Sequence, residues 1–276
     1  MSSFASNHEV AGADGALLRV FCAGPLDGDI VLCLHGIGQS ALAWSALGAV
    51  AEQHHWRVIA ADLRGHGGSD KPLDAYGDSR LWAEDVQALL EDAGASPDAR
   101  AILVGWSYGG AVLTDYLTVY GDTLVRAVVT AGATNKLGPA VSAYIQPPFG
   151  ALTKRIMTED GPAIAADLLD LCTSTPLEPA YREALLVEAV KCPAYVRNSM
   201  FRRQVDNDAA VAAFGGPWLV THGTKDQMFT IDLGKHLAET APNGSLSSYE
   251  DAGHLPLWDD PVRFISELDQ VIKESR

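Results

Sequence analysis

The sequence is poor in cysteine. Its 276 residues include four, Cys22, Cys33, Cys172 and Cys192, and no two of them are spaced as a CxxC pair. Cys22 and Cys33 lie in apolar runs, where cysteine is usually a small buried hydrophobic residue. The N-terminus also lacks the basic start and the apolar stretch of a secretory signal. These absences predict a reduced, cytoplasmic protein without disulfides.

Long apolar runs and basic residues are scarce as well. Because no run reaches the roughly 18 apolar residues that a membrane-spanning helix needs, we expect no membrane span. Lys and Arg number 20 against 35 Asp and Glu, which gives a formal net charge of −15. Such a surface repels the phosphates of nucleic acids and of anionic lipids. We therefore expect neither nucleic acid nor a membrane among the partners.

Short apolar runs alternate with helical patterns along most of the chain. The expected strands are Ile30–Leu34, Val58–Ala61, Ala101–Val104, Val125–Thr130 and Trp218–Thr221. The expected helices are Leu81–Leu90, Ala111–Tyr120, Ile231–Ala238 and Val262–Ile272. Strands that are apolar at nearly every position fit a parallel sheet covered on both faces. The predicted fold class is therefore α/β, with a mostly parallel, doubly wound sheet.

The alternation stops between residues 135 and 205. This stretch contains seven prolines and several helix-like pieces but no convincing strand. We interpret it as a helical cap inserted into a core made of residues 1–134 and 206–276. Such a cap would supply an apolar substrate pocket. The candidate lining residues, which fit the interior of the cap equally well, are Tyr144, Phe149, Leu152, Met200 and Phe201.

The strongest local signal is the pentapeptide Gly105–Gly109, GWSYG, with Ser107 at its centre. It follows an apolar strand and precedes a helical run, and in that setting G-x-S-x-G forms a nucleophile elbow. The flanking glycines allow close approach of helix and strand, and a helix N-terminus favours negative charge. We therefore predict that Ser107 is a nucleophile; the alternative is a solvated turn serine.

A serine hydroxyl needs a base to become a good nucleophile. His254 follows the strand-like run Leu246–Tyr249 and precedes the last helix, late in the chain, as the order serine, acid, histidine requires. Asp226 follows the strand that ends near Thr221, where a carboxylate can orient the imidazole. An acid one strand earlier is excluded, because residues 123–158 contain no Asp or Glu. His222 we expect to be structural.

Attack on a carbonyl also requires donors for the developing oxyanion. The backbone N–H of Tyr108, directly after the predicted nucleophile, is one candidate. The second is the N–H of Ile37 in the HGIG segment that follows the strand Ile30–Leu34. We expect His35 in the same segment to hold the loop rather than to take part in catalysis.

At these residues the chain resembles the α/β-hydrolase superfamily, in its capped, small esterase- and lactonase-like branch. The matching motifs, which run in order over nearly the whole chain, are HGIG at His35, DLRGHGGSD over Asp62–Asp70, GWSYGG at Gly105, GTKD at Gly223 and DAGHLPLWDDP at Asp251. The resemblance implies that Asp62–Asp70 is a structural loop and that His66 is not catalytic. Serine at position 107 disfavours the epoxide hydrolases and haloalkane dehalogenases of this branch, whose nucleophile is aspartate.

The leading functional hypothesis is hydrolysis of a carboxylic ester or lactone of a small molecule through an acyl-enzyme. Carbon–carbon bond hydrolysis, perhydrolysis of the cofactor-free haloperoxidase type and thioester hydrolysis use the same triad, and the sequence does not separate them. A cofactor-free oxygenase and a slow ligand receptor are alternatives of other classes. Because the sequence has no metal-ligand cluster, phosphate-binding glycine loop or dinucleotide fingerprint, we expect no cofactor and no metal.

Overall fold

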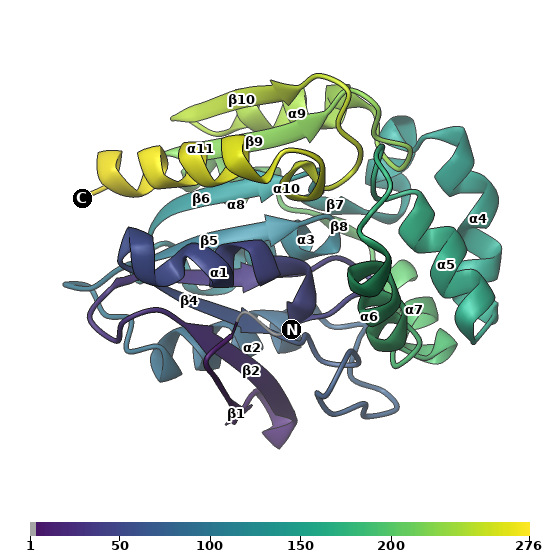
Figure 1. The fold of residues 1–276 in the computed structure, drawn as a ribbon, viewed down its shortest axis with the longest axis horizontal. Helices are drawn as coiled ribbons and strands as arrows, with labels where there is room; N and C mark the ends of the chain where they lie inside the picture. The colour runs from purple at the N-terminus through teal and green to yellow at the C-terminus, as the bar shows by residue number, and fades with distance from the viewer. Residues whose placement is uncertain (1–3) are drawn as a thin grey trace.

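A computed structural model describes residues 4–276 of the chain. Its centre is an eight-stranded sheet in the order β1-β2-β4-β3-β5-β6-β9-β10 (Figure 1). The strands are β1 (Ser6–Ala11), β2 (Leu17–Ala23), β3 (Asp29–Leu34), β4 (Trp56–Ala61), β5 (Ala101–Trp106), β6 (Val125–Ala131), β9 (Trp218–Gly223) and β10 (Gly244–Tyr249). β2 runs antiparallel to β1 and β4, and all other neighbouring pairs are parallel.

The five predicted strands lie within β3, β4, β5, β6 and β9. All residues of β5 are buried, as are nearly all of β3, β4 and β6, which explains their continuous apolar sequences. The predicted α/β fold class with a mostly parallel sheet is thereby confirmed. β1 was not predicted, because it lies at the sheet edge with a mostly exposed, polar sequence, and β2, whose residues are partly buried and partly exposed, was not predicted either.

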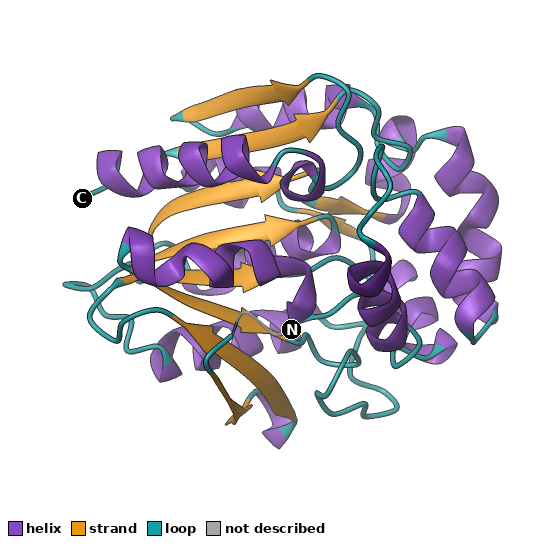
Figure 2. Ribbon diagram, viewed as in Figure 1, coloured by secondary structure: helices purple, strands orange, loops and turns teal. Residues whose placement is uncertain are grey.

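Helices cover both faces of the sheet (Figures 1 and 2). One face carries α1 (Ser45–His54) and α11 (Pro261–Glu274). The other face carries α2 (Ser79–Asp92), α3 (Tyr108–Tyr120), α8 (Asp208–Ala213) and α9 (Ile231–Thr240). The short helices η1 (Ala13–Gly15), η2 (Ala41–Trp44) and α10 (Pro256–Asp259) lie in the connecting segments. The four predicted helices fall within α2, α3, α9 and α11.

The segment between β6 and β9 forms a helical cap at one end of the sheet, on the right in Figure 1. It comprises η3 (Gly138–Tyr144), α4 (Pro147–Thr158), α5 (Pro162–Asp170), α6 (Pro179–Ala189) and α7 (Ala194–Phe201). Proline occupies the first position of α4, α5 and α6, where its fixed φ and missing N–H are tolerated. Three of the seven prolines that interrupt the sequence pattern therefore begin helices of the cap.

The chain enters and leaves the cap through a two-stranded antiparallel ribbon. β7 (Lys136–Leu137) pairs with β8 (Val205–Asp206), and Lys136 Nζ donates to the carboxylate of Asp206 at 2.6 Å. This pairing brings together two points of the chain that are about seventy residues apart. It supports our proposal that the boundary between core and cap lies close to residues 135 and 205.

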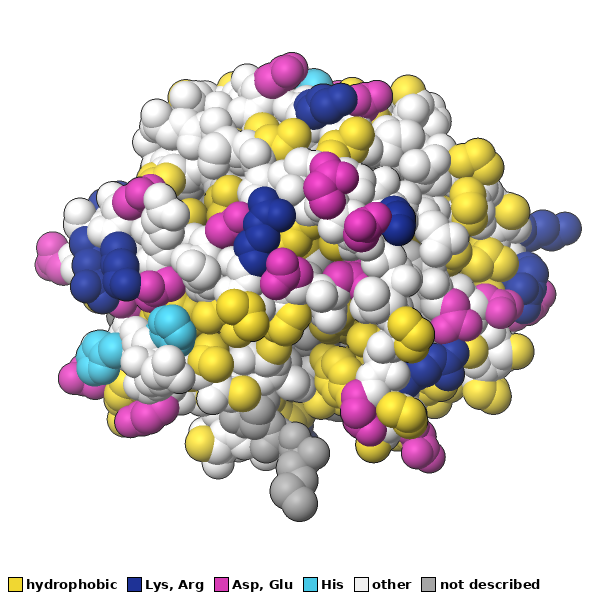
Figure 3. Space-filling model, turned by 45° about the horizontal axis from the view of Figure 1, so that its top comes forward, with side chains coloured by type: hydrophobic (Ala, Val, Ile, Leu, Met, Phe, Trp, Pro, Cys, Tyr) yellow, Lys and Arg dark blue, Asp and Glu magenta, His cyan; other side chains and the backbone are white. Residues whose placement is uncertain are grey.

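Within residues 4–276, the structure contains no helix with the length and apolar character needed to cross a bilayer. On the face in Figure 3, Lys and Arg occur singly or in small groups beside Asp and Glu, and apolar side chains lie between them. Cys22, Cys33, Cys172 and Cys192 are free thiols.

Candidate active site

Ser107 occupies the sharp turn between β5 and α3. Its backbone has φ 54° and ψ −119°, a conformation that residues with a Cβ rarely adopt. The turn is held by hydrogen bonds from Ser107 N to Ala131 O at 3.1 Å and from Thr134 N to Ser107 O at 3.2 Å. This is the geometry expected of the elbow, and it leaves Ser107 lining a cavity at the carboxyl end of the sheet.

α3 begins at Tyr108, three residues earlier than the sequence predicts. The difference arises at Gly109 and Gly110, which are poor helix formers but which the packing requires. A Cβ on Gly109 would lie 2.1 Å from Leu34 O, and one on Gly110 would lie 2.6 Å from Ala133 Cβ. Glycine therefore lets the first turn of α3 pack directly against the backbone after β3.

His254 and Asp226 form a buried hydrogen-bonded pair. Asp226 follows β9, His254 follows β10, and His254 Nδ1 lies 2.8 Å from Asp226 Oδ2. The other carboxylate oxygen accepts from Met228 N at 2.7 Å and Phe229 N at 3.1 Å. Burial raises the pKa of Asp226, but the neighbouring His254 and these donors outweigh it and leave the pKa below its ordinary value. The carboxylate is therefore ionised at neutral pH.

The second ring nitrogen of His254 is free to act as a base. Nε2 is buried and has no hydrogen-bond partner among the residues that the structure describes. With Nδ1 donating to Asp226, Nε2 carries the lone pair. The ring centroids of Trp106 and Phe229 lie 5.9 and 5.6 Å from the centroid of the His254 imidazole, so two aromatic rings pack around it.

His222 is a second histidine beside the same carboxylate. Its Nε2 lies 3.3 Å from Asp226 Oδ2 and 3.3 Å from Phe229 O. Burial lowers the pKa of His222 below its ordinary value, against the opposing effect of Asp226. A neutral His222 that packs behind Asp226 agrees with the structural role expected from the sequence.

The two residues that carry the candidate oxyanion donors, Ile37 in the loop after β3 and Tyr108 at the start of α3, both line the cavity. The N–H of Tyr108 is the first of α3 and has no acceptor inside the helix. Across residues 4–276, no protein acceptor is paired with the Ile37 N–H. Both predicted oxyanion donors are thus free to bind a ligand oxygen.

The loop that carries Ile37 is braced by buried side chains. His35 Nε2 accepts from Leu63 N at 3.0 Å, and His66 Nε2 accepts from Gly38 N at 3.1 Å. The carboxylate of Asp62 accepts from Ala41 N at 2.8 Å. Burial lowers the pKa of His35 to about 4 and that of His66 well below its ordinary value, so both remain neutral acceptors. These contacts give His35 and His66 structural roles, as the sequence predicts.

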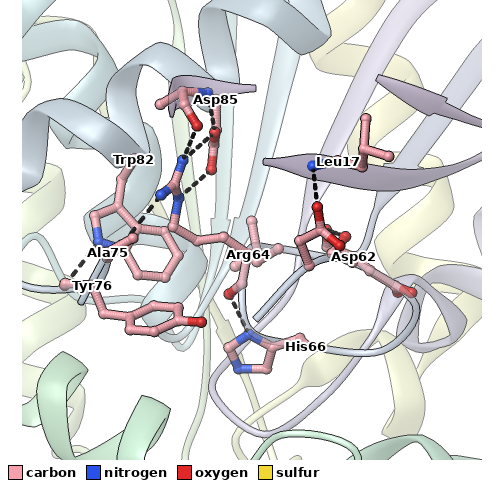
Figure 4. A network of polar contacts seen from close by, with 12 residues as sticks. Leu17, Asp62, Arg64, His66, Ala75, Tyr76, Trp82 and Asp85 are labelled. Atoms are coloured by element: carbon pink, nitrogen blue, oxygen red, sulfur yellow. Dashed lines mark hydrogen bonds and ion pairs between the residues drawn. The ribbon is translucent and has the colours of Figure 1, made fainter. Parts of the chain in front are cut away.

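The segment Asp62–Asp70 is itself held by a buried ion pair (Figure 4). Arg64 Nε and Nη2 each donate to a carboxylate oxygen of Asp85 on α2 at 2.6 Å, and both side chains are almost fully buried. Arg64 Nη1 also donates to Ala75 O at 3.2 Å, and His66 Nδ1 lies 3.0 Å from Arg64 O. The loop that carries Ile37 is therefore bonded to a segment that is itself held to α2 by the pair of Arg64 and Asp85.

A mostly apolar cavity of about 220 Å³ lies between Ser107 and the cap. Of the residues that the sequence suggested for the pocket, Phe149, Met200 and Phe201 line it. Tyr144 and Leu152 are not among its lining residues and pack against the core at its side. Lining residues that the sequence did not single out are Thr134, Leu137, Gly138, Val141, Ile145, Thr153 and Phe229. Apart from Gly138 and the threonines, they have the apolar character of any buried residue, so no sequence signal marks them.

Arg203, just after α7, is a buried cation that the sequence analysis missed. Its Nη1 donates to Tyr108 Oη at 2.6 Å, and its Nη2 donates to Ser79 Oγ at 2.8 Å and to the carboxylate of Asp115. The Cζ atom of its guanidinium also lies 5.6 Å from the ring centroid of Trp82. Arg203 therefore connects the end of the cap to the helix that begins at the elbow.

No cluster of three or more His, Cys, Asp or Glu side chains in the described part of the chain is arranged to hold a metal ion.

Comparison with known proteins agrees with this arrangement. Residues 31–267 match the alpha/beta hydrolase family. The structure is similar to that of the esterase RhEst1 from Rhodococcus sp. ECU1013, with a TM-score of 0.90 and 34% identity over 98% of this chain and 100% of that one. Over 262 residues the chain is 30% identical to a non-heme chloroperoxidase of Streptomyces lividans, covering 89% of this chain and 92% of the relative. It is also 26% identical over 255 residues to a 2-hydroxymuconate semialdehyde hydrolase of Pseudomonas sp. (strain CF600), covering 89% and 87%. The chain belongs to the alpha/beta hydrolase family and is an esterase-like hydrolase.

Proposed function

We propose that the protein hydrolyses a carboxylic ester or lactone of a small molecule through an acyl-enzyme on Ser107. One observation carries this proposal: His254, paired with Asp226 at 2.8 Å, keeps a buried and unpartnered Nε2, and its ring centroid lies 5.9 Å from that of Trp106, the residue directly before Ser107. A carboxylate, an imidazole and a serine that follow three strands of one sheet are the components of a catalytic triad.

Acylation follows from these positions. Ser107 Oγ attacks the substrate carbonyl carbon while His254 Nε2 takes the hydroxyl proton. The N–H groups of Ile37 and Tyr108 bind the oxyanion of the tetrahedral intermediate, and the Asp226 carboxylate stabilises the imidazolium. His254 then returns the proton to the leaving alcohol oxygen as the bond from carbon to that oxygen breaks.

Deacylation repeats these steps with water. His254 Nε2 removes a proton from a water molecule that attacks the acyl carbon, and the same amides hold the second oxyanion. The bond to Ser107 Oγ breaks and His254 protonates that oxygen, which restores the free serine and releases the acid. All groups that these steps need come from the protein, the substrate and water, so we propose that no cofactor or metal takes part.

The cavity favours an uncharged, apolar acyl group. None of the described residues that line it is Lys, Arg, Asp or Glu, and the cap contributes Val141, Ile145, Phe149, Met200 and Phe201. A volume of about 220 Å³ exceeds the roughly 150 Å³ of an apolar cavity that binds benzene. We infer a substrate whose acyl part is a small ring or a short to medium chain. A carboxylate on the acyl side would lie there without a cation, which disfavours acidic substrates.

Perhydrolysis is the second candidate, because the chain is 30% identical to a non-heme chloroperoxidase over most of both sequences. In that reaction hydrogen peroxide replaces water: it loses a proton to His254 Nε2 and attacks the acyl carbon, the bond to Ser107 Oγ breaks as that oxygen is protonated, and the acyl group leaves as a peracid. The remaining alternatives among reactions are carbon–carbon bond hydrolysis, thioester hydrolysis and cofactor-free oxygenation. They call for a diketone, a thioester or molecular oxygen, and each is tested by supplying that reactant.

Two further expectations from the sequence belong to this proposal. We propose that residues 135–205 form the cap and that residues 1–134 and 206–276 form the core, which the ribbon between β7 and β8 supports. We also propose a cytoplasmic enzyme, which four free thiols support.

The decisive experiment compares the wild type with Ser107→Ala on p-nitrophenyl acetate, butyrate and octanoate. Ser245→Ala, at an exposed position on β10, is the matched control. We expect Ser107→Ala to lose at least about a thousandfold in kcat and the control to retain wild-type activity. If Ser107→Ala hydrolyses these esters at the wild-type rate, Ser107 is not the nucleophile and the proposal is wrong.

A further inference from the structure

A segment of the cap lies directly on the loop that carries His254. We call residues 172–175, between α5 and α6, the strap. Leu255 N donates to Cys172 O at 3.0 Å, and Ser174 Oγ donates to Asp251 O. A Cβ added to Gly253 would lie 2.8 Å from Ser174 N, so the strap and the histidine loop are in backbone contact.

Asp259 lies between the strap and the histidine loop and accepts hydrogen bonds from both. One carboxylate oxygen accepts from Thr175 N at 3.0 Å, from Thr175 Oγ1 at 2.6 Å and from Ser174 N at 3.2 Å. The other accepts from Gly253 N, the amide directly before His254, at 2.7 Å. Every one of these neighbours is a donor, so the site suits a carboxylate, which only accepts.

The charge state of Asp259 agrees with this role. Burial raises its pKa, but the hydrogen bonds from Thr175 and Gly253 outweigh burial and leave the pKa below its ordinary value. The side chain is therefore ionised throughout the neutral range. Hydrogen bonds to an ionised acceptor are roughly twice as strong as those between neutral groups.

We propose that Asp259 is a positioning residue that fixes the backbone at Gly253, and with it the ring of His254, to the strap of the cap. The inference rests on the proposed function, because it assigns a purpose to the placement of the proposed base. Displacement of the strap would move the peptide that carries His254 out of line with Asp226 and Ser107. Asp259 thus makes the triad dependent on a cap that is seated on the core.

A second contact extends the same dependence to the acid of the triad. Gln146, at the start of α4, donates from its N–H to Met228 O at 2.9 Å and from Nε2 to Asp226 O at 3.3 Å. The loops of His254 and Asp226 are therefore each bonded to the cap, at points that are far apart in sequence. A cap held away from the core would lose both contacts.

The test substitutes Asp259→Asn and uses Asp260→Asn as the matched control. Asp260 is the adjacent carboxylate and accepts from Arg263 N at 3.1 Å at the start of α11, away from the strap. Asparagine keeps the size of aspartate but turns an NH2 group toward donors. We expect Asp259→Asn to lower kcat by about tenfold to a hundredfold, the cost of displacing a catalytic group by about 1 Å, with KM changed less than about threefold. Asp260→Asn should stay within about twofold in both constants.

A conservative series separates positioning from a general loss of stability. Thr175→Val removes the 2.6 Å hydrogen bond from the strap but keeps the carboxylate and its bond to Gly253. We expect a loss in kcat of about twofold to tenfold, and this variant remains informative if Asp259→Asn does not fold. Asp259→Glu keeps the charge, and we expect it to restore part of the kcat lost in Asp259→Asn.

The outcomes distinguish this inference from the proposed function. If Ser107→Ala is inactive while Asp259→Asn and Thr175→Val match the wild type in kcat, the positioning role is wrong and the triad stands. If the Asp259→Asn and Asp260→Asn variants lose stability and activity in parallel, Asp259 is only structural and the inference is again wrong. If Ser107→Ala is fully active, the proposed function fails on its own.

Discussion

Replacing Arg203 by methionine should cost much more stability than any surface substitution. Arg203 and Asp115 each expose 1% of their side chains, and the guanidinium donates to Asp115, Tyr108 and Ser79. Methionine keeps most of the apolar volume but removes the positive charge. Asp115 then remains buried, and its remaining partners include Asn207 Nδ2 at 3.2 Å.

The magnitude follows from leaving one charge of a buried pair without its partner. Removing one member of such a pair typically costs about 3–5 kcal/mol, because the remaining charge keeps its desolvation penalty. For a protein of this size that corresponds to a fall in Tm on the order of 10 °C. Arg202→Met is the control, because Arg202 is the exposed neighbour and has no ion pair among the described residues. We expect the control to stay within about 0.5 kcal/mol of the wild type.

The pH dependence gives the prediction a second check. In the wild type, burial raises the pKa of Asp115, and Arg203 opposes this shift. Without Arg203 the folded-state pKa rises further, so the folded variant binds a proton that the unfolded chain binds only at lower pH. The deficit of Arg203→Met, meaning its loss in the free energy of unfolding relative to the wild type, should therefore shrink as the pH falls from 8 toward 5. Urea unfolding of the wild type and of Arg203→Met across this range measures this deficit. A deficit below about 1 kcal/mol at pH 8, or one that grows on acidification, would refute the reasoning.

Two further predictions concern the pocket and the HGIG segment that begins at His35. Phe149→Ala should widen the cavity beside Phe201 and Phe229 and so raise the ratio of kcat/KM for octanoate over acetate esters at least about tenfold. It should also lower the free energy of unfolding in urea by about 3–5 kcal/mol. An unchanged ratio would mean that Phe149 does not bound the acyl site. His35 has a folded pKa of about 4 against an ordinary value of 6.5, so between these values only the unfolded chain takes up its proton and stability falls as the pH falls. His35→Gln should remove on the order of 3 kcal/mol of this acid dependence, and equal pH profiles for the two proteins would contradict the assignment.

The residues proposed for catalysis were accessible from the sequence because each follows an apolar strand in a recognisable local motif. Ser107 lies between two glycines, and the proposed base and acid, His254 and Asp226, occur in the order and spacing that the sheet imposes. Parallel strands place their carboxyl ends along one edge, so residues after β5, β9 and β10 meet without any knowledge of side-chain packing.

The pocket and the contacts that hold the site were not accessible in the same way. Val141 and Phe229 both line the cavity, yet their sequence surroundings resemble those of other buried apolar residues. Arg203 looks like one of several basic residues near the end of the cap, and only the packing of α3 against α2 shows that it is buried. Asp259 likewise acquires its proposed role only from its contacts with Thr175, in the strap of the cap, and with Gly253, in the loop after β10.

The α/β class, the inserted cap and the candidate triad could be inferred from the amino-acid sequence, because periodicity and strand-end motifs are local properties of the chain. The cap residues that bound the cavity, the contact between the strap and the histidine loop, and the partners of Arg203 and Asp259 became visible only in the folded protein. Those features depend on contacts between segments that are far apart in sequence, and a hydrophobic pattern specifies that a residue is buried without specifying what it is buried against.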